Sequence, residues 1–398
     1  MTFWNRGKNE HPRIYADAAA STPLSARARA ELVRLLEMYG NPGGLHKEGV
    51  AAKEELERAR ATVAAAVGAH ADEIVFTASG TEANNLALHA AHGQVITTTI
   101  EHPSVLEPLY HSGARVTEVL GIEEIKKAIT LETTLVSVQL VNSEVGLIQP
   151  VREIAKLLRK QNKKIVFHTD ASQAPLWLDI DVEKLGVDLM TLDAQKILGP
   201  KGVGALYIRR GTPVEPQLYG GGQEWGLRSG TENVPLIGAF AEALREAQEG
   251  AGERAAHVAE VRDYLWSEIK KVLPDAVLNG LSLAGAAKSG DERPRLEGES
   301  EGLAAQALRV ANNLNISVPD LNGEMAVIAL DALGVAVSTK SACSTGEEDP
   351  SPVLLALGVA PELAAGAIRI TLLPGVSRAD ADAIAAALAE VAARYRQS

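Results

Sequence analysis

Short apolar runs alternate with helical patterns from Glu73 to Ile208, and this alternation restricts the fold of the 398-residue chain more than any other feature. The pattern predicts an α/β fold in which helices cover both faces of a mostly parallel sheet. Because ligands of such sheets bind at the carboxyl ends of the strands, the loops that follow strands are the first candidates for a site. Strands are predicted at Glu73–Thr77, Gln94–Thr98, Ala114–Val119, Thr134–Val141, Lys164–His168, Leu189–Leu192 and Val203–Ile208. Helices are predicted at Ser25–Met38 and Lys47–Val67 and between most of these strands, for example Thr81–Ala91 and Val151–Gln161.

The pattern changes after Leu236, and a chain of this length exceeds one ordinary hydrophobic core, so two domains are predicted. A long helical region over 236–272, with a break near Gly250–Gly252, leads into the second domain. The segment Leu281–Gly302 is poor in large apolar residues and is predicted to be a mobile surface excursion. Further strands are predicted at Val310–Val318, Val335–Ser338 and Ala367–Leu372, and further helices at Glu324–Leu333, near Pro352–Leu357 and from Arg378.

Composition excludes several classes of function. A net charge of −12, without a cluster of Lys and Arg, argues against a nucleic-acid surface. No apolar run has membrane-spanning length and the first residues lack the apolar core of a signal peptide, so a cytoplasmic protein is predicted. The single cysteine, Cys343, excludes an internal disulfide and a multi-cysteine metal site. His89 and His92 share a helical face without a third ligand nearby, so no metal site is predicted.

Lys196 lies between two predicted buried strands, in a loop punctuated by Gly199, Pro200 and Gly202. An enclosed lysine loses its charge on desolvation, and a neutral amine is the form that makes a Schiff base with a carbonyl. A lysine at a strand end is otherwise a solvated turn residue, so Lys196 alone leaves both interpretations open. The glycines after it are not a dinucleotide fingerprint, because a strand rather than a helix follows them.

The segment Ala78–Glu82 follows a predicted strand and opens a helix. Free N–H groups and the helix dipole at such a start would cradle a phosphate. The ordinary alternative is a helix cap, formed by Thr81 with Glu82 and Asn84.

Two more polar residues follow predicted strands. His102, directly before a proline, is either an exposed loop histidine or a ligand contact. Asp170 would either cap a turn or keep a heterocyclic nitrogen protonated, with Gln173 three residues further along.

Three residues of the second half of the chain are also candidates. Arg228, in a glycine-rich loop, is uninformative alone. Arg369 lies within an apolar strand, where an arginine either faces an edge or grips a carboxylate. Cys343 lies in a small-residue polar loop, which favours a reactive thiol over an inert buried one.

Taken together, these residues resemble the cysteine desulfurases of the NifS/IscS type, which are pyridoxal-phosphate (PLP) enzymes of fold type I in the class V aminotransferase superfamily. The resemblance runs from about Tyr15 to Thr371, and so many matches in order are very specific for the family. The matching stretches are Asp17–Pro23, Gly40–Pro42, Glu73–Ala87, Glu101–His102, Asp170–Gln173, Lys196–Tyr207, Arg228–Thr231, Ser341–Cys343 with Asp349–Ser351, and Ala356–Gly358.

The resemblance implies catalytic roles for three of these residues. Lys196 would hold PLP as a Schiff base and move the proton of the substrate Cα. His102 would stack on the pyridine ring. Cys343 would attack the sulfur of the bound cysteine and carry it away as a persulfide.

The resemblance also implies binding roles. Asp170 would face the pyridine nitrogen, and Gln173 the phenolic oxygen. Gly80 and Thr81 would bind the phosphate together with Thr231 of the partner subunit, which requires a homodimer. For the substrate carboxylate, the residues implied are Arg369 and Asn41.

Three residues depart from the family pattern, all near the implied cofactor. Gln195 replaces the usual His before the lysine, and Ser143 replaces the second Asn of an Asn-Asn-Glu motif; both are still expected to contact PLP. Asp193 stands where a Ser usually helps to hold the phosphate. Because a carboxylate repels a phosphate dianion, Asp193 is expected either to point away or to shift the cofactor.

The expected activity is conversion of L-cysteine to L-alanine, with a persulfide on Cys343 that supplies a sulfur-acceptor protein for iron–sulfur clusters or thiolation. The implied domains are a large PLP-binding domain over 14–250 and a small C-terminal domain over 251–398, which carries the Cys343 loop and on which 1–13 packs. Two alternatives stay open: a selenocysteine lyase or another class V PLP enzyme, and a binding protein that kept the fold and lost the cofactor.

Overall fold

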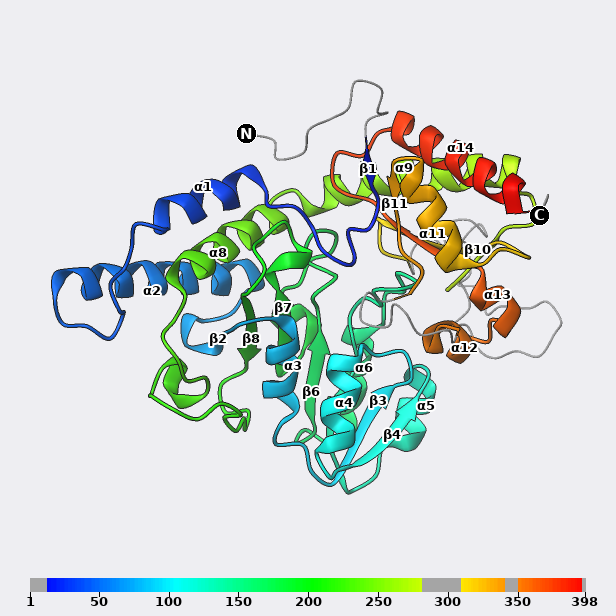
Figure 1. The fold of residues 1–398 in the computed structure, drawn as a ribbon. Coiled ribbons are helices and arrows are strands. Elements are labelled where there is room, and N and C mark those ends of the chain that lie inside the picture. The colour runs from blue at the N-terminus through cyan, green and yellow to red at the C-terminus, as the bar shows by residue number, and fades with distance from the viewer. Residues whose placement is uncertain (1–12, 281–308, 341–349, 396–398) are drawn as a thin grey trace. The chain divides into compact units, whose positions relative to one another are not determined.

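The computed structural model of the chain describes residues 13–280, 309–340 and 350–395 (Figure 1). The described residues form two compact units. The first consists of 21–142 and 148–253, and the second of 13–20, 143–147 and the described residues from 254 onward. The predicted excursion Leu281–Gly302 and the Cys343 loop lie outside the described residues.

A seven-stranded sheet with the order β2-β8-β7-β6-β5-β3-β4 forms the centre of the first unit. Strands β3, β4, β5, β6 and β7 are mutually parallel, and β8 is antiparallel to both β2 and β7. The antiparallel pairing of β8 follows from the short loop after β7, which has no room for a crossover. The α/β class with a mostly parallel sheet is confirmed. The strands are β2 (Ile74–Thr77), β3 (Gln94–Thr98), β4 (Arg115–Val119), β5 (Thr133–Ser137), β6 (Val166–Asp170), β7 (Leu189–Asp193) and β8 (Gly204–Ile208).

Helices pack against this sheet and against one another. Helix α3 contacts β2, β7 and β8, with α4 beside it, and α6 contacts β6. Helix α8 lies along α1 and α2 (Figure 1), where a Cβ added at Gly238 would lie 2.2 Å from Leu35 Cδ1, so a larger residue there would force the Leu35 side chain to move. The helices of this unit are α1 (Ala26–Leu35), α2 (Lys47–Val67), α3 (Gly80–Leu88), α4 (Pro103–His111), α5 (Ile122–Ala128), α6 (Val151–Gln161), α7 (Val182–Leu185) and α8 (Val234–Gln248), with 3₁₀ turns η1 (Ala71–Glu73), η2 (Ala194–Lys196) and η3 (Glu224–Gly226).

The predicted break in the long helical region is confirmed. Gly250, with φ of 74°, separates α8 from α9 (Ala251–Val272). The backbone there is left-handed, a conformation that glycine adopts without strain.

The second unit has a small antiparallel sheet with the order β12-β10-β9. Helix α11 packs against α14 and β12, and a parallel pair, β1 with β11, forms a separate two-stranded sheet. None of the helices in the described ranges is long and apolar enough to cross a lipid bilayer. The elements of this unit are β1 (Ile14–Tyr15), β9 (Val277–Leu278), β10 (Asn313–Ser317), α11 (Gly323–Ala332), β11 (Val335–Ala336), α12 (Pro352–Ala356), α13 (Pro361–Ala365), β12 (Ala367–Thr371) and α14 (Arg378–Tyr395).

Candidate active site

Charged side chains gather in the first unit where β3, β6 and β7 end. Asp170 is the last residue of β6, Asp193 is the last residue of β7, and His102 is the N-cap of α4, four residues after β3. The charges of Asp170, Lys196 and Asp193 all act on the pKa of His102, so the four groups lie within electrostatic range of one another. The sheet therefore brings these predicted residues together at the edge where α/β folds bind ligands.

Asp170 is oriented by a buried asparagine. Its Oδ1 accepts the N–H of Ser172 at 2.9 Å, and its Oδ2 accepts Nδ2 of Asn84 at 2.7 Å. Asn84 also donates to Oγ of Ser104 at 2.9 Å, and Ser104 Oγ lies 2.8 Å from Nδ1 of His102. Asn84 and Ser104, which sequence reasoning did not assign to the site, therefore link the carboxylate to the histidine.

The surroundings of His102 favour its neutral form. Burial lowers its pKa below the usual 6.5, and Lys196 adds to that effect while Asp170 and Asp193 oppose it. Its Nδ1 accepts the N–H of Ser104 at 3.1 Å, which fixes the ring at the start of α4. A neutral, fixed imidazole can stack on a planar ligand without adding charge.

The start of α3 is capped by Ser79 and not, as the sequence suggested, by Thr81. Oγ of Ser79 accepts the N–H of Glu82 at 3.1 Å. Gly80 and Thr81 lie in the first turn of the helix, where the backbone N–H groups have no acceptor within the helix. Arg228, uninformative in the sequence, donates from Nε to Glu82 Oε1 at 2.8 Å and so ties its loop to this helix start.

Asp193 faces the start of α3 rather than pointing away from it. A Cβ added at Gly80 would lie 2.9 Å from Cβ and 3.1 Å from Oδ2 of Asp193, so only glycine permits the approach. The Asp193 carboxylate accepts two hydrogen bonds from Gln195, one from the backbone N–H at 3.2 Å and one from Nε2 at 3.1 Å. Burial raises the pKa of Asp193, although the Gln195 amide and Lys196 oppose the rise.

Lys196 ends the η2 turn, and the loop around it is held by Thr22. Oγ1 of Thr22 accepts the N–H of Leu198 at 2.7 Å and donates to the carbonyl of Gln195 at 2.9 Å. Leu198 has a φ of 63°, a strained value for a residue with a branched side chain. Thr22 thus stabilises the strained turn that presents a half-buried Lys196.

Arg369 and Ser143 belong to the second unit. Arg369 is 1% exposed, and its Nη2 donates to Oδ1 of Asp17 at 2.7 Å. Its Nη1 lies 3.4 Å from the carbonyl oxygen of Ser143, while no described residue is a partner for its Nε. The carboxylate that a buried arginine needs is therefore supplied within the unit by Asp17.

Four predicted site residues remain to be placed: Asn41, Thr231, Gln173 and Cys343. Asn41 is exposed, accepts the N–H of Gly43 at 2.9 Å and lines a separate cavity of about 530 Å³. Thr231 is exposed, and within the described ranges neither it nor Asn41 has a hydrogen bond to the strand-end cluster. Gln173 is half-buried, and Cys343 lies outside the described residues.

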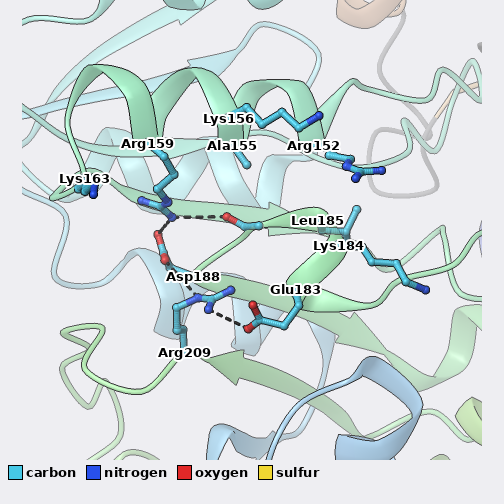
Figure 2. Close-up of a pocket in the computed structure, with 11 residues that line it drawn as sticks. Arg152, Ala155, Lys156, Arg159, Lys163, Glu183, Lys184, Leu185, Asp188 and Arg209 are labelled. Atoms are coloured by element: carbon cyan, nitrogen blue, oxygen red, sulfur yellow. Dashed lines mark hydrogen bonds and ion pairs between the residues drawn. The ribbon is translucent and has the colours of Figure 1, made fainter.

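A pocket of about 640 Å³ beside α6 is distinct from this cluster (Figure 2). Figure 2 shows Arg159 and Arg209 on either side of Asp188, with which both form ion pairs. Asp188 directly precedes the five-residue strand β7, whereas Asp193 ends it. At about 3.3 Å per residue, the two ends are roughly 16 Å apart, so this pocket lies at the opposite edge of the sheet.

Comparisons with known proteins show the family to which the chain belongs. Residues 14–286 match the family model described as aminotransferase class V. The cysteine desulfurase IscS of Dictyoglomus turgidum is 38% identical over 377 residues, which cover 90% of this chain and 89% of that protein. The cysteine desulfurase IscS 1 of Archaeoglobus fulgidus is 35% identical over 400 residues, which cover 96% and 97%.

Solved structures give the same result. A NifS-like protein superposes with a TM-score of 0.84 at 33% identity and covers 96% of this chain and 100% of its own. DndA from Streptomyces lividans superposes with a TM-score of 0.71 at 32% identity, covering 91% and 100%.

The sheet, the lysine turn after β7 and the matched family model define an enzyme of the class V aminotransferase type, a PLP-dependent class. Within that class, the chain belongs to the cysteine desulfurase family of the NifS/IscS type. The family resemblance drawn from the sequence is confirmed.

Proposed function

We propose that this chain is a cysteine desulfurase that uses PLP to convert L-cysteine to L-alanine and retains the sulfur as a persulfide on Cys343. The observation that supports this most directly is the cluster of Lys196, Asp170 and His102 at the strand ends. It occurs in a chain similar to cysteine desulfurases over nearly its whole length.

The residues of the first unit fit PLP at several points. Asp170, held by Asn84, offers an oriented carboxylate that keeps a pyridine nitrogen protonated. The first-turn amides at Gly80 and Thr81 offer an anion site for the phosphate. When bound, PLP supplies an electron sink that makes the substrate Cα–H acidic and its C–S bond cleavable.

The side chains then divide the proton and sulfur transfers. The amine of Lys196 accepts the Cα proton, and the thiolate of Cys343 attacks the substrate sulfur. An S–S bond forms as the substrate C–S bond breaks; the two sulfur atoms are oxidised, and Cβ is reduced and takes up a proton. L-cysteine and the enzyme thiol thus give L-alanine and a persulfide without an external oxidant.

We extend the proposal to the finer assignments that the family resemblance implies. Gln173, Gln195 and Ser143 contact the cofactor, and Thr231 of the partner subunit completes the phosphate site in a homodimer. Arg369 holds the substrate carboxylate, with Asn41 nearby. We also propose that a sulfur-acceptor protein in the cytoplasm receives the persulfide and that residues 14–250 and 251–398 form the two domains.

The test is alanine formation from L-cysteine by PLP-loaded wild type and by Cys343→Ala. Because the nucleophile is lost, we expect Cys343→Ala to form alanine about a thousandfold more slowly or worse. It should keep the visible absorption of lysine-bound PLP, which a Lys196→Ala control should lose. Equal alanine formation by Cys343→Ala would exclude Cys343 as the nucleophile, and a loaded wild type that forms none would indicate a different class V substrate.

A further inference from the structure

The start of α3 offers a site for one anion, and a carboxylate already borders it. The distances from Gly80 show that Asp193 abuts the first helical turn. Asp193 is only 7% exposed and has little room to withdraw. On the adjacent strand, a Cβ added at Gly204 would lie 2.7 Å from both the Ser79 carbonyl carbon and the Leu192 carbonyl oxygen. A phosphate at this helix start would therefore meet a neighbouring side chain of the same charge sign.

Gln195 compensates Asp193 when no phosphate is near. The backbone N–H of Gln195 donates to Oδ1 of Asp193, and its Nε2 donates to Oδ2. Two of the three departures from the family pattern thus form one hydrogen-bonded pair beside Lys196. Because Nε2 can donate to an ionised carboxylate, the pair is stable without a proton as long as a second anion is absent.

We propose that Asp193 makes cofactor binding proton-coupled: the phosphate of PLP enters the α3 site together with one proton, which Asp193 and the phosphate share. The affinity for PLP then falls as the pH rises. This inference rests on the proposed function, since it requires PLP at Lys196.

The charges around Asp193 permit this coupling. Lys196 is a cation that favours the ionised carboxylate, and Asp170 is an anion that disfavours it. His102, also within range, is held neutral by burial, and Glu82 at the helix start is paired with Arg228. Burial already raises the pKa of Asp193, and a phosphate dianion raises it further because like charges disfavour ionisation.

The test is a PLP titration of the apoprotein between about pH 6 and pH 9, with visible absorption reporting the dissociation constant. Calorimetry in buffers of different ionisation enthalpy counts the protons taken up. The variants are Asp193→Ser, which restores the family residue, and Asp193→Asn, which keeps the size and removes the charge. Asp179→Asn, at an exposed aspartate paired with Lys184, is the matched control.

Consider the pH range in which Asp193 is ionised in the free protein and protonated in the complex. There, each added pH unit should raise the wild-type Kd for PLP by about ten times the factor seen in either variant. The wild type should take up about one proton more than Asp193→Ser. Near pH 8, Asp193→Ser should bind PLP at least about tenfold more tightly than wild type, because the like-charge repulsion is gone. Asp179→Asn should bind as wild type does.

Equal pH slopes and equal proton uptake in wild type and both variants would overturn the inference. If that wild type still forms alanine from L-cysteine, the proposed function stands and only the proton coupling is wrong. If neither the wild type nor the variants bind PLP at any pH, the proposed function fails together with the inference.

Discussion

At the scale of single residues, the orientation of Asp170 depends most directly on Asn84. The Asn84 side chain is buried and donates to both Asp170 and Ser104. Asn84→Ala removes both hydrogen bonds and leaves two partly or fully buried acceptors without their donor. We expect the free energy of unfolding of the apoprotein to fall by about 1–3 kcal/mol in urea denaturation. PLP binding should weaken as well, because Asp170 is no longer held in place.

The neighbouring Asn85→Ala is the control. Asn85 is half-buried on the same helix; its Nδ2 donates to the carbonyl of Thr81 at 2.9 Å, and its Oδ1 accepts Nε2 of Gln217 at 3.4 Å. Its loss should change stability by less than about 0.5 kcal/mol. Equal stability of the two variants would mean that Asn84 does not hold Asp170.

The role of Asn84 illustrates what a sequence shows of a single residue. Three positions after Thr81, it matched the spacing of a helix cap and was interpreted as one. The helical period also places it on the same face as Gly80 and Leu88, both buried, and an asparagine on a buried face needs hydrogen-bond partners. That signal indicated a buried contact, but not that Asp170, 86 residues away, would be the partner.

At the scale of elements, a buried ion pair joins η3 to α2 and β2. Arg60 of α2 donates to both carboxylate oxygens of Glu224 at 2.7 Å, and Glu224 also accepts the N–H of Phe76 at 2.9 Å. The two charged side chains are 2% and 1% exposed. Glu224 and Trp225 have φ values of 47° and 55°, so the ion pair holds a strained stretch just before the Arg228 loop.

Glu224→Gln should destabilise the protein strongly, because it leaves the buried Arg60 guanidinium with the partly exposed Glu57 as its remaining counter-charge. We expect a loss of about 3–5 kcal/mol in urea denaturation. Glu57 contacts the same arginine from a half-buried position, and Glu57→Gln should cost less than about 1 kcal/mol. If both variants lost a similar amount of stability, burial of the Arg60–Glu224 pair would not be what makes Glu224 important.

The sequence predicted the presence of elements better than their ends; β5, for example, was predicted over Thr134–Val141 but runs over Thr133–Ser137. Helices α2 and α6 have the predicted bounds. Strand β6 was predicted over Lys164–His168 but runs over Val166–Asp170, because Asp170 continues the pairing with β7. Polar residues at a functional strand end lack the apolar pattern, so the prediction misplaced this strand end by two residues.

At the scale of the whole molecule, the sequence predicted the arrangement of site residues in the first compact unit better than in the second. Lys196, His102 and Asp170 lie in one unit, and their positions at or just after predicted strands were enough to expect them at one edge of a mostly parallel sheet. For Arg369 the sequence left two interpretations open, a position facing an edge or contact with a carboxylate. That Asp17, 352 residues away, supplies one within its unit is a property of tertiary packing that no local pattern shows.

Two buried groups, Glu101 after β3 and His168 in β6, change global stability with pH in opposite directions. Burial raises the pKa of Glu101 to about 8, although it accepts hydrogen bonds from Thr98 and Gln139. Burial lowers the pKa of His168 to about 4. From 4.5 to about 8, folded Glu101 keeps a proton that the unfolded chain releases, so stability falls as the pH rises. Between pH of about 4 and 6.5, His168 binds a proton in the unfolded chain but not in the folded protein. Stability therefore rises as the pH rises through this range.

The two effects cancel between 4.5 and 6.5, and above 6.5 Glu101 is the one of these two groups that continues to act. At about 1.4 kcal/mol per pH unit, the wild-type apoprotein should lose roughly 2 kcal/mol between pH 6.5 and 8 in urea denaturation. Asp193, whose pKa burial also raises, acts in the same direction. Glu101→Gln is neutral at every pH and should lose about 2 kcal/mol less over this interval.

The exposed Glu107→Gln controls for the change from carboxylate to amide and should follow the wild type at every pH. A wild type as stable at pH 8 as at pH 6.5 would contradict the prediction, because Glu101 would then ionise in the folded protein without cost. Glu101 accepts three hydrogen bonds from Thr98 and Gln139, and the effect of burial outweighs them in raising its pKa. A flat profile would therefore require water to reach Glu101 in the folded state.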